Sequence, residues 1–366
     1  MKKPHLESTY KLFINGEWKE ASDKATYKSC CPANGEVLAE CAQATREDVE
    51  DAITAAWAAF ETWKNVPVNE RAEILNKVAD IIDENREHLA MVETLDNGKP
   101  IRETLNVDIP MAAQHFRYFA GCIMASEGSA NILGKDTLSL SLREPIGVGG
   151  QIVPWNFPFL MAAWKLAPVL ASGCCTVFKP SSSTSLSVLE LARLVQGVIP
   201  RGVFNVITGS GSKSGQYMLE SKRFRKLAFT GSTEVGRNVA LAAAERIIPA
   251  TLELGGKSAN IFFEDCDWEM AMDGLQMGIL FNQGQVCCAG SRVFVQDSIY
   301  DRFVEEAVKR FNAVKVGLPW ESDTQMGCQI SKRQMEKILG YWEIGKKEGA
   351  KVLCGGVQDT EGELKN

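Results

Sequence analysis

Residues 149–153, Gly-Gly-Gln-Ile-Val, begin the series of short apolar runs that decides the fold. The runs that follow are Thr176-Val177-Phe178, Val203 to Ile207, Lys226 to Phe229 and Asn260 to Phe263. Segments with helical periodicity lie between them, among them Ser185 to Val195 and Val235 to Ile247. This alternation predicts an α/β fold with a parallel, doubly wound sheet, which binds ligands beyond the carboxyl ends of its strands.

The region before residue 146 is predicted to be mainly helical behind an N-terminal hairpin. Asn15-Gly16 lies between apolar residues and favours a two-residue turn, because both positions must accept a positive φ. Thr45, with Asp48 three residues later, predicts the start of a helix from Arg46 to Lys64. A second helical pattern runs from about Asn69 to Gly98, where a glycine favours a helix end.

Residues 137–143, Thr-Leu-Ser-Leu-Ser-Leu-Arg, alternate strictly between polar and apolar side chains. That period predicts a strand with one apolar face. The strand lies between a helical stretch and the first run of the parallel sheet, so we expect a protruding β arm. An exposed strand edge pairs readily with another strand, which here predicts contact with another subunit.

The last hundred residues are predicted to form a further α/β unit. Its expected elements are a helix from Trp268 to Leu280, a strand from Arg292 to Val295, a helix from Ser298 to Asn312, a helix from Lys332 to Lys347 and a short strand from Lys351 to Cys354. Ser298 is the expected N-cap of the third of these elements.

The composition indicates a soluble globular protein and argues against two classes of partner. The 366 residues are 45% hydrophobic and 23% charged, which is typical of globular domains, and the formal net charge of −6 argues against a nucleic-acid surface. The longest apolar stretch, Pro158 to Ser172, is interrupted by Lys165, so no membrane span is expected. The N-terminus turns polar at once, without the core of a signal peptide, and we expect a cytoplasmic location.

The cysteines and histidines indicate reduced thiols and no metal site. The 11 cysteines are an odd number, include three adjacent pairs and form no Cys-x-x-Cys, which does not fit a disulfide framework or a zinc site. His5, His88 and His115 are the only histidines, and none lies near a glycine-rich turn in sequence. A Cys–His catalytic pair is therefore poorly supported.

Two residues in glycine-containing segments are candidates for chemistry. Glu253 ends a predicted strand and precedes two glycines, which let the backbone approach a ligand closely. Cys287 follows a Gly-Gln-Val turn, where a thiol can meet a substrate as a nucleophile and a carboxylate can act as base. Each signal has a plain structural alternative, because a Cys-Cys pair usually packs in a core and a glutamate before Gly-Gly is usually a turn residue.

Taken together, several segments resemble the aldehyde dehydrogenase superfamily, of the NAD(P)-dependent, non-acylating type. The segments, which keep the family's order and spacing, are Val153-Pro154-Trp155-Asn156-Phe157-Pro158, Phe178-Lys179-Pro180-Ser181-Ser182-Ser183, Gly209-Ser210-Gly211, Phe229 to Gly236, Leu252-Glu253-Leu254-Gly255-Gly256-Lys257-Ser258 and Phe281 to Gly290. The resemblance extends from Phe13 to Gly356, nearly the whole chain. Its most specific parts are the Glu-Leu-Gly-Gly-Lys and Gly-Gln-x-Cys segments.

The resemblance implies three catalytic roles. Cys287 corresponds to the nucleophile, which forms a thiohemiacetal with an aldehyde and, after hydride leaves for the nicotinamide, a thioester. Asn156 corresponds to the side-chain donor to the oxyanion, together with the backbone N–H of Cys287. Glu253 corresponds to the base that activates the hydrolytic water. No metal is implied, and the product is a carboxylic acid.

The resemblance also implies a site for NAD or NADP. Lys179 corresponds to a ribose contact, and Ser232 with neighbouring glycines to a pyrophosphate site at a helix N-terminus. The full set of expected cofactor residues is Lys179, Ser182, Trp155, Gly209, Gly231, Ser232, Gly236, Gly255, Gln334 and Lys337. Many NAD-preferring relatives carry glutamate at the position of Ser182, so we expect this chain to tolerate the 2′-phosphate of NADP.

The resemblance further predicts how the chain is divided. Residues 1–124 and 146–254 are expected to form the nicotinamide dinucleotide-binding domain, residues 125–145 the oligomerisation arm of a homodimer or homotetramer, and residues 255–366 the catalytic domain. The chain ends before a later Glu-containing Phe-Gly-Pro segment of the family and before a terminal strand that pairs with a neighbour's arm. We therefore expect the C-terminal part of the catalytic domain to be missing, and cofactor binding and activity to be weak.

Two other functions remain open from the sequence. The same nucleophile and oxyanion donors could cleave activated esters as an esterase-like hydrolase without a cofactor. A shortened relative could also keep the fold and be catalytically impaired. A CoA-dependent acylating enzyme is less favoured, because Glu253 supplies the base that hydrolysis needs.

Overall fold

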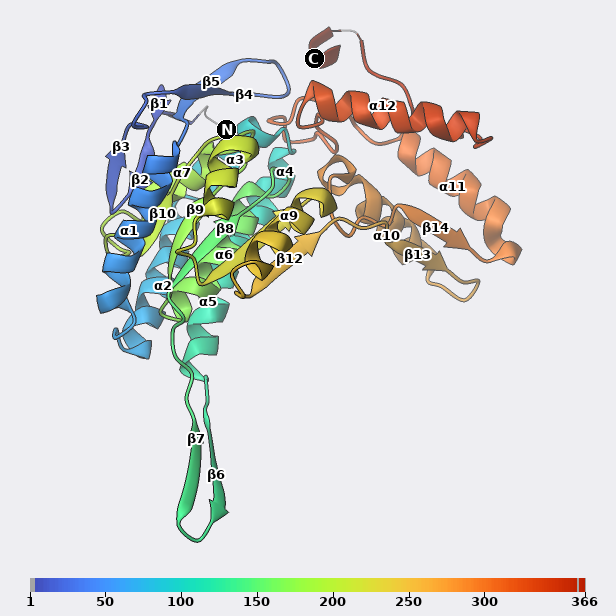
Figure 1. Ribbon diagram of the computed structural model, residues 1–366. Coiled ribbons are helices and arrows are strands. Elements are labelled where there is room, and N and C mark those ends of the chain that lie inside the picture. The colour runs from blue at the N-terminus through green and yellow to red at the C-terminus, as the bar shows by residue number, and fades with distance from the viewer. Residues whose placement is uncertain (1–3, 361, 366) are drawn as a thin grey trace.

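A large α/β body carries a long two-stranded arm on one side and, on another, a smaller α/β unit, after which the chain reaches a final 3₁₀ turn, η5 (Gly362–Lys365) (Figure 1). The computed structural model describes residues 4–360 and 362–365. Among these residues, no helix is both long enough and apolar enough to cross a membrane.

The body is built on a seven-stranded sheet in the order β12-β11-β8-β9-β10-β2-β3. Its strands are β2 (Leu12–Ile14), β3 (Glu17–Lys19), β8 (Val148–Ile152), β9 (Cys175–Lys179), β10 (Phe204–Val206), β11 (Lys226–Gly231) and β12 (Ala250–Leu254). The five strands from β12 to β10 are parallel, and the β2–β3 hairpin adds to the edge in antiparallel pairing. The prediction of a parallel, doubly wound sheet is confirmed.

The strand order reverses between β8 and β11. The chain continues from β8 through β9 to β10 in one direction and then crosses to β11 and β12 on the other side of β8. Ile152 at the end of β8 pairs in register with Phe229 in β11. In open α/β sheets a ligand crevice forms at such a reversal, outside the carboxyl ends of the strands.

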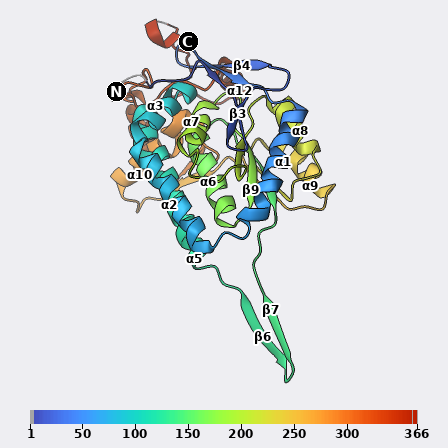
Figure 2. The same cartoon turned by 90° about the vertical axis from the view of Figure 1, so that its left-hand side faces the viewer.

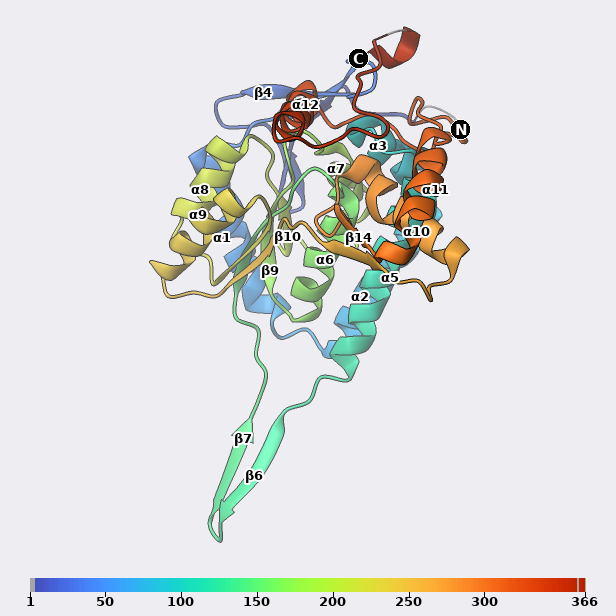
Figure 3. The same cartoon turned by 90° about the vertical axis from the view of Figure 1, so that its right-hand side faces the viewer.

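Helices cover both faces of this sheet, as Figures 2 and 3 show. One face carries α1 (Arg46–Trp63), α8 (Gln216–Glu220) and α9 (Thr233–Ala244). The other face carries α2 (Val68–Glu84), α3 (Arg86–Asn97), α5 (Ile109–Met124), α6 (Pro158–Ala171) and α7 (Leu186–Leu194). Short helical turns connect them: α4 (Ile101–Glu103) and the π-helices η1 (Thr104–Asp108) and η2 (Gly211–Gly215). One continuous apolar core fills the space between these layers and the sheet.

Local sequence signals explain the starts and ends of several elements. Asn15 and Gly16 have φ values of 55° and 72°, as the predicted hairpin turn requires. Thr45 and Asp48 form the predicted capping box at the start of α1. The helix expected from Asn69 to Gly98 is two helices instead, because the chain turns at Asn85, whose φ of −107° is not helical.

Two small sheets lie outside the large sheet of the body. One consists of β1 (Thr9–Tyr10), β5 (Val37–Ala42) and β4 (Thr26–Cys30). The other is the arm, in which β6 (Ser129–Gly134) pairs antiparallel with β7 (Thr137–Ser141). Ile132 on the arm is 84% exposed and Leu140 is 61% exposed, so the predicted apolar strand face lies open to solvent.

The unit after β12 has a small core of its own. It contains β13 (Ala259–Phe262), α10 (Trp268–Leu280), η3 (Phe281–Gly284), β14 (Arg292–Val295), η4 (Asp297–Ile299), α11 (Tyr300–Asn312) and α12 (Lys332–Lys347). Its core residues are Phe262, Met272, Leu275, Phe303 and Ala307. Strand β13 pairs with β14 and not with the large sheet, which corrects the grouping of the Asn260 to Phe263 run with the strands before it.

Two further expectations for this unit are wrong. Ser298 does not cap α11, because its hydroxyl donates to Glu264 Oε2 at 2.7 Å while residues 297–299 form a separate 3₁₀ turn. Residues 351–354, which the structure describes, form no strand, since this apolar stretch lies against the groove beside α11 and α12 without a strand partner.

Candidate active site

The parallel strands bring most of the predicted site residues to one edge of the sheet. Each lies at or just after the carboxyl end of a strand: Trp155 and Asn156 after β8, Lys179 and Ser182 at β9, Gly209 after β10, Gly231 and Ser232 at β11, and Glu253 and Gly255 at β12. Because β8 and β11 flank the reversal of strand order, the first and fourth of these groups border the crevice expected there.

Three glycines allow neighbouring segments to pack closely near this edge. A Cβ on Gly209, which has a φ of 132°, would collide with the hydroxyl of Ser214. A Cβ on Gly231 would meet the ring of Phe229, and one on Gly236 would meet the Leu254 side chain, so α9 packs closely on β12. This close packing resembles the use of glycine in dinucleotide-binding sheets, where the backbone must approach a pyrophosphate.

The N-terminus of α9 opens toward solvent at the same edge. Ser232 is its N-cap and accepts the N–H of Val235 at 3.3 Å, while Ser232 and Thr233 are exposed. Unpaired N–H groups and the helix dipole make such a terminus favourable for an anion. The arrangement fits the phosphates of a dinucleotide.

Lys179 is almost fully buried at the end of β9, with 2% of its surface exposed. Its ammonium donates to the carbonyl oxygen of Pro180 at 2.9 Å, and burial lowers its pKa to about 8. Ser182, two residues after Pro180, is half-buried.

The loop that carries Cys287 begins with an unusual backbone turn. Asn282, Gln283 and Gly284 have φ values of 47°, 55° and 74°, so three consecutive residues adopt the left-handed conformation. Two of them are not glycine, which costs of the order of 1–3 kcal/mol each and is tolerated where surrounding contacts fix the chain. Strain of this kind is frequent at functional sites.

Asn156 and the Cys287 loop hold one another directly. The Asn156 side-chain amide donates to the carbonyl oxygen of Gln285 at 2.8 Å. In return, the Asn282 side-chain amide donates to the backbone carbonyl oxygen of Asn156 at 2.7 Å. The rings of Phe157 and Phe281, each adjacent to one of these asparagines, stack with centroids 6.0 Å apart. The predicted oxyanion donor is thereby fixed two residues from the predicted nucleophile.

Polar side chains from α3 and α4 bind backbone groups next to this contact. Asn97 donates to the Trp155 carbonyl oxygen at 2.6 Å, and Glu103 accepts the backbone N–H of Asn282 at 2.9 Å. Burial raises the pKa of Glu103 to about 7, while nearby Lys99 and the Asn282 N–H oppose that rise. Lys99 is itself fully buried and paired with Asp108.

The Cys287 side chain is exposed, and its environment favours the thiol. Partial burial and the adjacent Cys288 raise the pKa of Cys287 above its ordinary value, although the backbone N–H of Cys288 acts in the opposite direction. Attack by Cys287 would therefore require a base or a local field to remove the proton.

Glu253 lies at the exposed end of β12, close to the same loop. A methyl group on neighbouring Gly256 would lie 3.3 Å from the Cys287 carbonyl oxygen, so the Gly-Gly turn and the Cys287 loop are in close contact. Lys165 from α6 faces Glu253: burial lowers the pKa of Lys165 to about 8, and the Glu253 carboxylate partly opposes this.

Four supporting residues were not identified from the sequence. Asn282 and Gln285 lie in the Phe281 to Gly290 segment, but the sequence suggested no role for them. The positive φ of Asn282 fits the tolerance of asparagine for this conformation. Lys165 was noted only as a charge inside an apolar stretch. Glu103 gave no signal, because an isolated glutamate in a helical pattern is normally a solvated side chain.

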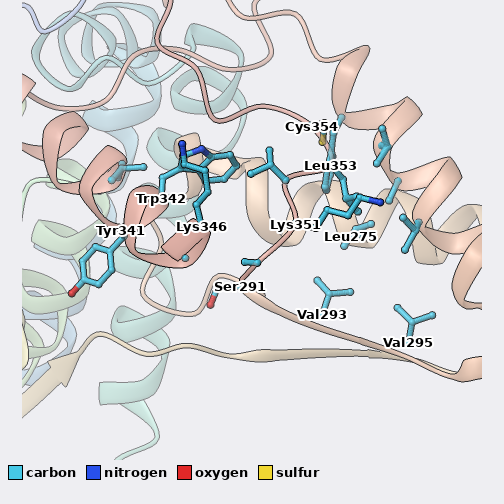
Figure 4. Close-up of a pocket in the computed structure, with 18 of the residues that line it drawn as sticks. Leu275, Ser291, Val293, Val295, Tyr341, Trp342, Lys346, Lys351, Leu353 and Cys354 are labelled. Atoms are coloured by element: carbon cyan, nitrogen blue, oxygen red, sulfur yellow. The ribbon is translucent and has the colours of Figure 1, made fainter. Parts of the chain in front are cut away.

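Gln334 and Lys337 lie beside a groove in the unit after β12 and not at the edge of the large sheet. They line a groove of 1020 Å³ between α11, α12 and β14, together with Lys257. Figure 4 shows the apolar floor of this groove, with Val293 and Val295 from β14 and Trp342 from α12 pointing into it.

No cluster of three or more histidine, cysteine, aspartate or glutamate side chains in residues 4–360 and 362–365 could hold a metal ion. The assembled groups are the Cys287 thiol, the Asn156 amide and the Glu253 carboxylate, at the same sheet edge as the exposed N-terminus of α9. This combination can perform nucleophilic attack on a carbonyl carbon with stabilisation of the oxyanion.

Comparison with known proteins identifies the family. A model described as the aldehyde dehydrogenase family matches residues 18–366. The chain is 49% identical to aldehyde dehydrogenase B of Escherichia coli K12, covering 99% of this chain and 72% of that protein, and 49% identical to an acetaldehyde dehydrogenase of Pseudomonas aeruginosa, covering 97% and 71%. The structure of an aldehyde dehydrogenase from Bacillus cereus in complex with NAD⁺ superposes with a TM-score of 0.95 at 42% identity, covering 98% of this chain and 76% of that one. The chain belongs to the aldehyde dehydrogenase family.

Proposed function

We propose that this protein oxidises an aldehyde to the carboxylic acid with NAD or NADP, through a thioester on Cys287. The observation that carries the proposal is the pair of hydrogen bonds joining Asn156 and the Cys287 loop, which fixes an amide donor beside a nucleophile at the ligand edge of the sheet. Family membership and the likeness to an NAD⁺ complex support it.

The residues of the chain divide the chemistry among them. Cys287 attacks the carbonyl carbon of the aldehyde once its proton has been taken up by Glu253 or by water. The Asn156 amide uses one N–H for the Gln285 carbonyl and has a second N–H to offer to the developing oxyanion. Glu253 then activates the water that hydrolyses the thioester.

The cofactor supplies the acceptor for the hydride that leaves the carbon atom bound to Cys287. The residues that would hold it are Lys179 for a ribose hydroxyl and Ser232 with Gly209 and Gly231 for the phosphates. The bare backbone at these glycines and the exposed α9 N-terminus fit such a group. Ser182 carries no charge to repel a 2′-phosphate, so we infer that NADP is accepted beside NAD.

The division of the chain follows from the same proposal. Residues 1–124 and 146–254 bind the cofactor, residues 255–366 contribute Cys287, and residues 125–145 serve as the oligomerisation arm of a homodimer or homotetramer. The exposed Leu138, Leu140 and Leu142 of the arm support contact with another subunit.

The test is an aldehyde panel with each cofactor on the purified protein. Reduced nicotinamide is followed by absorbance, and mass spectrometry locates the acyl group after rapid quenching. Acylation of Cys287 that requires cofactor is the expected result, and Cys287→Ser should abolish it. Cleavage of an activated ester without any aldehyde oxidation would instead establish the esterase alternative, and an acyl group on another side chain would overturn the mechanism.

A further inference from the structure

The turn before Cys287 depends on a carboxylate that is distant in sequence. Asn282 is fully buried and left-handed, and its backbone N–H is held by Glu103 Oε2 at 2.9 Å. Glu103 is 4% exposed, and this N–H is its hydrogen-bond partner in the described part of the chain. The carboxylate therefore acts as a fixed acceptor at the first residue of the turn.

Neighbouring contacts hold the rest of the turn but do not replace this one. The Gln283 side chain donates to the Cys328 carbonyl oxygen at 2.8 Å, and the Gln285 side chain accepts the N–H of Ile330 at 3.1 Å. Both of these contacts join the turn to the loop before α12, while a longer Gln283 contact of 3.3 Å reaches the Gly98 carbonyl oxygen at the end of α3. Glu103 joins it instead to α4, on the side of the body that supports Asn156.

The side chain of Asn282 connects this fixed backbone position to Asn156, the predicted oxyanion donor. Its amide donates to the Asn156 carbonyl oxygen at 2.7 Å and to the Gln285 carbonyl oxygen at 3.3 Å, and the Asn156 amide donates to the same Gln285 oxygen at 2.8 Å. If the backbone of Asn282 rotated, its amide would leave both carbonyls. Asn156 would then lose its orientation relative to Cys287.

We propose that Glu103 is a positioning residue for aldehyde oxidation: by accepting the N–H of Asn282, it sets the angle at which Asn156 and Cys287 face the substrate. The inference rests on the proposed function but not on the identity of the aldehyde. We expect neither substrate nor cofactor to touch Glu103, whose hydrogen bond to the Cys287 loop is the one to the Asn282 N–H. Removing its acceptor oxygen should therefore lower kcat more than it raises KM or weakens cofactor binding.

Glu103→Leu and Glu103→Gln provide the test. Leucine fills a similar volume without an acceptor, and glutamine keeps a carbonyl oxygen that can accept the Asn282 N–H. We expect Glu103→Leu to lower kcat at least tenfold with KM within threefold, and Glu103→Gln to keep at least half of kcat at pH 7. Glu87→Gln on α3, an exposed glutamate, is the matched control and should match the wild type.

A second readout separates this inference from the proposed function. The rate at which iodoacetamide alkylates Cys287, followed by mass spectrometry, should change at least fivefold in Glu103→Leu and less than twofold in Glu103→Gln. If the wild type oxidises no aldehyde, the proposed function fails, while the alkylation rates still test the positioning role. Unchanged kcat and alkylation in folded Glu103→Leu, or an equal loss in both variants, would overturn it.

Asn282→Gly keeps the test decisive if Glu103→Leu does not fold. Glycine accepts the left-handed backbone but removes the amide that reaches Asn156. The inference requires a similar loss of kcat in this variant, measured at a temperature at which circular dichroism shows that it is folded. A kcat within twofold of wild type would show that the position of Asn156 does not depend on this chain of contacts.

Discussion

The two sides of the candidate active site are built in opposite ways. The amide side, formed by Asn156, Asn282, Asn97 and Glu103, is buried or half-buried and joined by hydrogen bonds of 2.6 to 2.9 Å. The carboxylate side, formed by Glu253 at the exposed end of β12, faces Lys165 through an electrostatic interaction.

The difference follows from what each side must do. An oxyanion donor is effective only when it is held in place before charge develops, so rigidity and burial serve it. A base must exchange protons with water, so contact with solvent serves it.

The largest effect is expected on the carboxylate side, from Glu253→Gln. Positioned general bases contribute roughly 10²–10⁴-fold, so steady-state turnover should fall by about that factor. Hydrolysis of the thioester should slow more than its formation, and stopped-flow absorbance should show a burst of reduced cofactor followed by slow turnover. Glu305→Gln, an exposed glutamate on α11, is the control and should behave as wild type. Equal slowing of both phases would show that Glu253 acts before the thioester forms.

On the amide side, Asn156→Ala should lower kcat/KM by about 10²–10³-fold, as removal of one oxyanion donor typically does. The substitution also leaves the Gln285 carbonyl without its 2.8 Å donor. Asn156→Asp keeps the shape but replaces the donor with an acceptor, so it should be no better than alanine. Steady-state kinetics with circular dichroism as a folding control make the measurement, and an active aspartate variant would exclude the donor role.

The sequence predicted the strand-end half of the site better than its support. Parallel strands place their carboxyl ends at one edge, so Asn156, Lys179 and Glu253 could be assigned to one site from strand pattern and family resemblance. Glu103 could not, because its partner Asn282 is 179 positions away and the pairing follows from tertiary packing. For the same reason residues 351–354 were predicted as a strand: apolar content indicates burial, whereas pairing requires a neighbour.

A smaller effect is expected at the open edge of the cofactor site, from Ser182→Glu. A carboxylate here should repel a 2′-phosphate and accept hydrogen bonds from ribose hydroxyls. The ratio of kcat/KM for NAD to that for NADP should rise by about tenfold, which corresponds to ~1.4 kcal/mol. Ser182→Gln, similar in size but uncharged, should shift the ratio much less. If both variants shift it equally, size and not charge controls the preference.

The smallest effect concerns how the free energy of unfolding depends on pH through Asp96, which lies next to Asn97 of the amide side. Burial raises the pKa of Asp96, on α3 beside Asn97, to about 7, although Ser29 and the Leu186 N–H donate to it. The folded state therefore binds a proton that the unfolded state releases near pH 4, and this stabilisation is lost as the pH rises through 7.

Between pH 6 and 8 this single group should lower the free energy of unfolding by about 1 kcal/mol, in urea titrations at each pH. Asp96→Asn should remove that share of the slope, because the amide does not titrate and the Ser29 hydroxyl can turn to accept from it. An unchanged slope in a folded Asp96→Asn would mean that Asp96 is ionised throughout this range. The Ser29 hydroxyl and the Leu186 N–H would then be sufficient to keep a buried carboxylate charged next to Asn97.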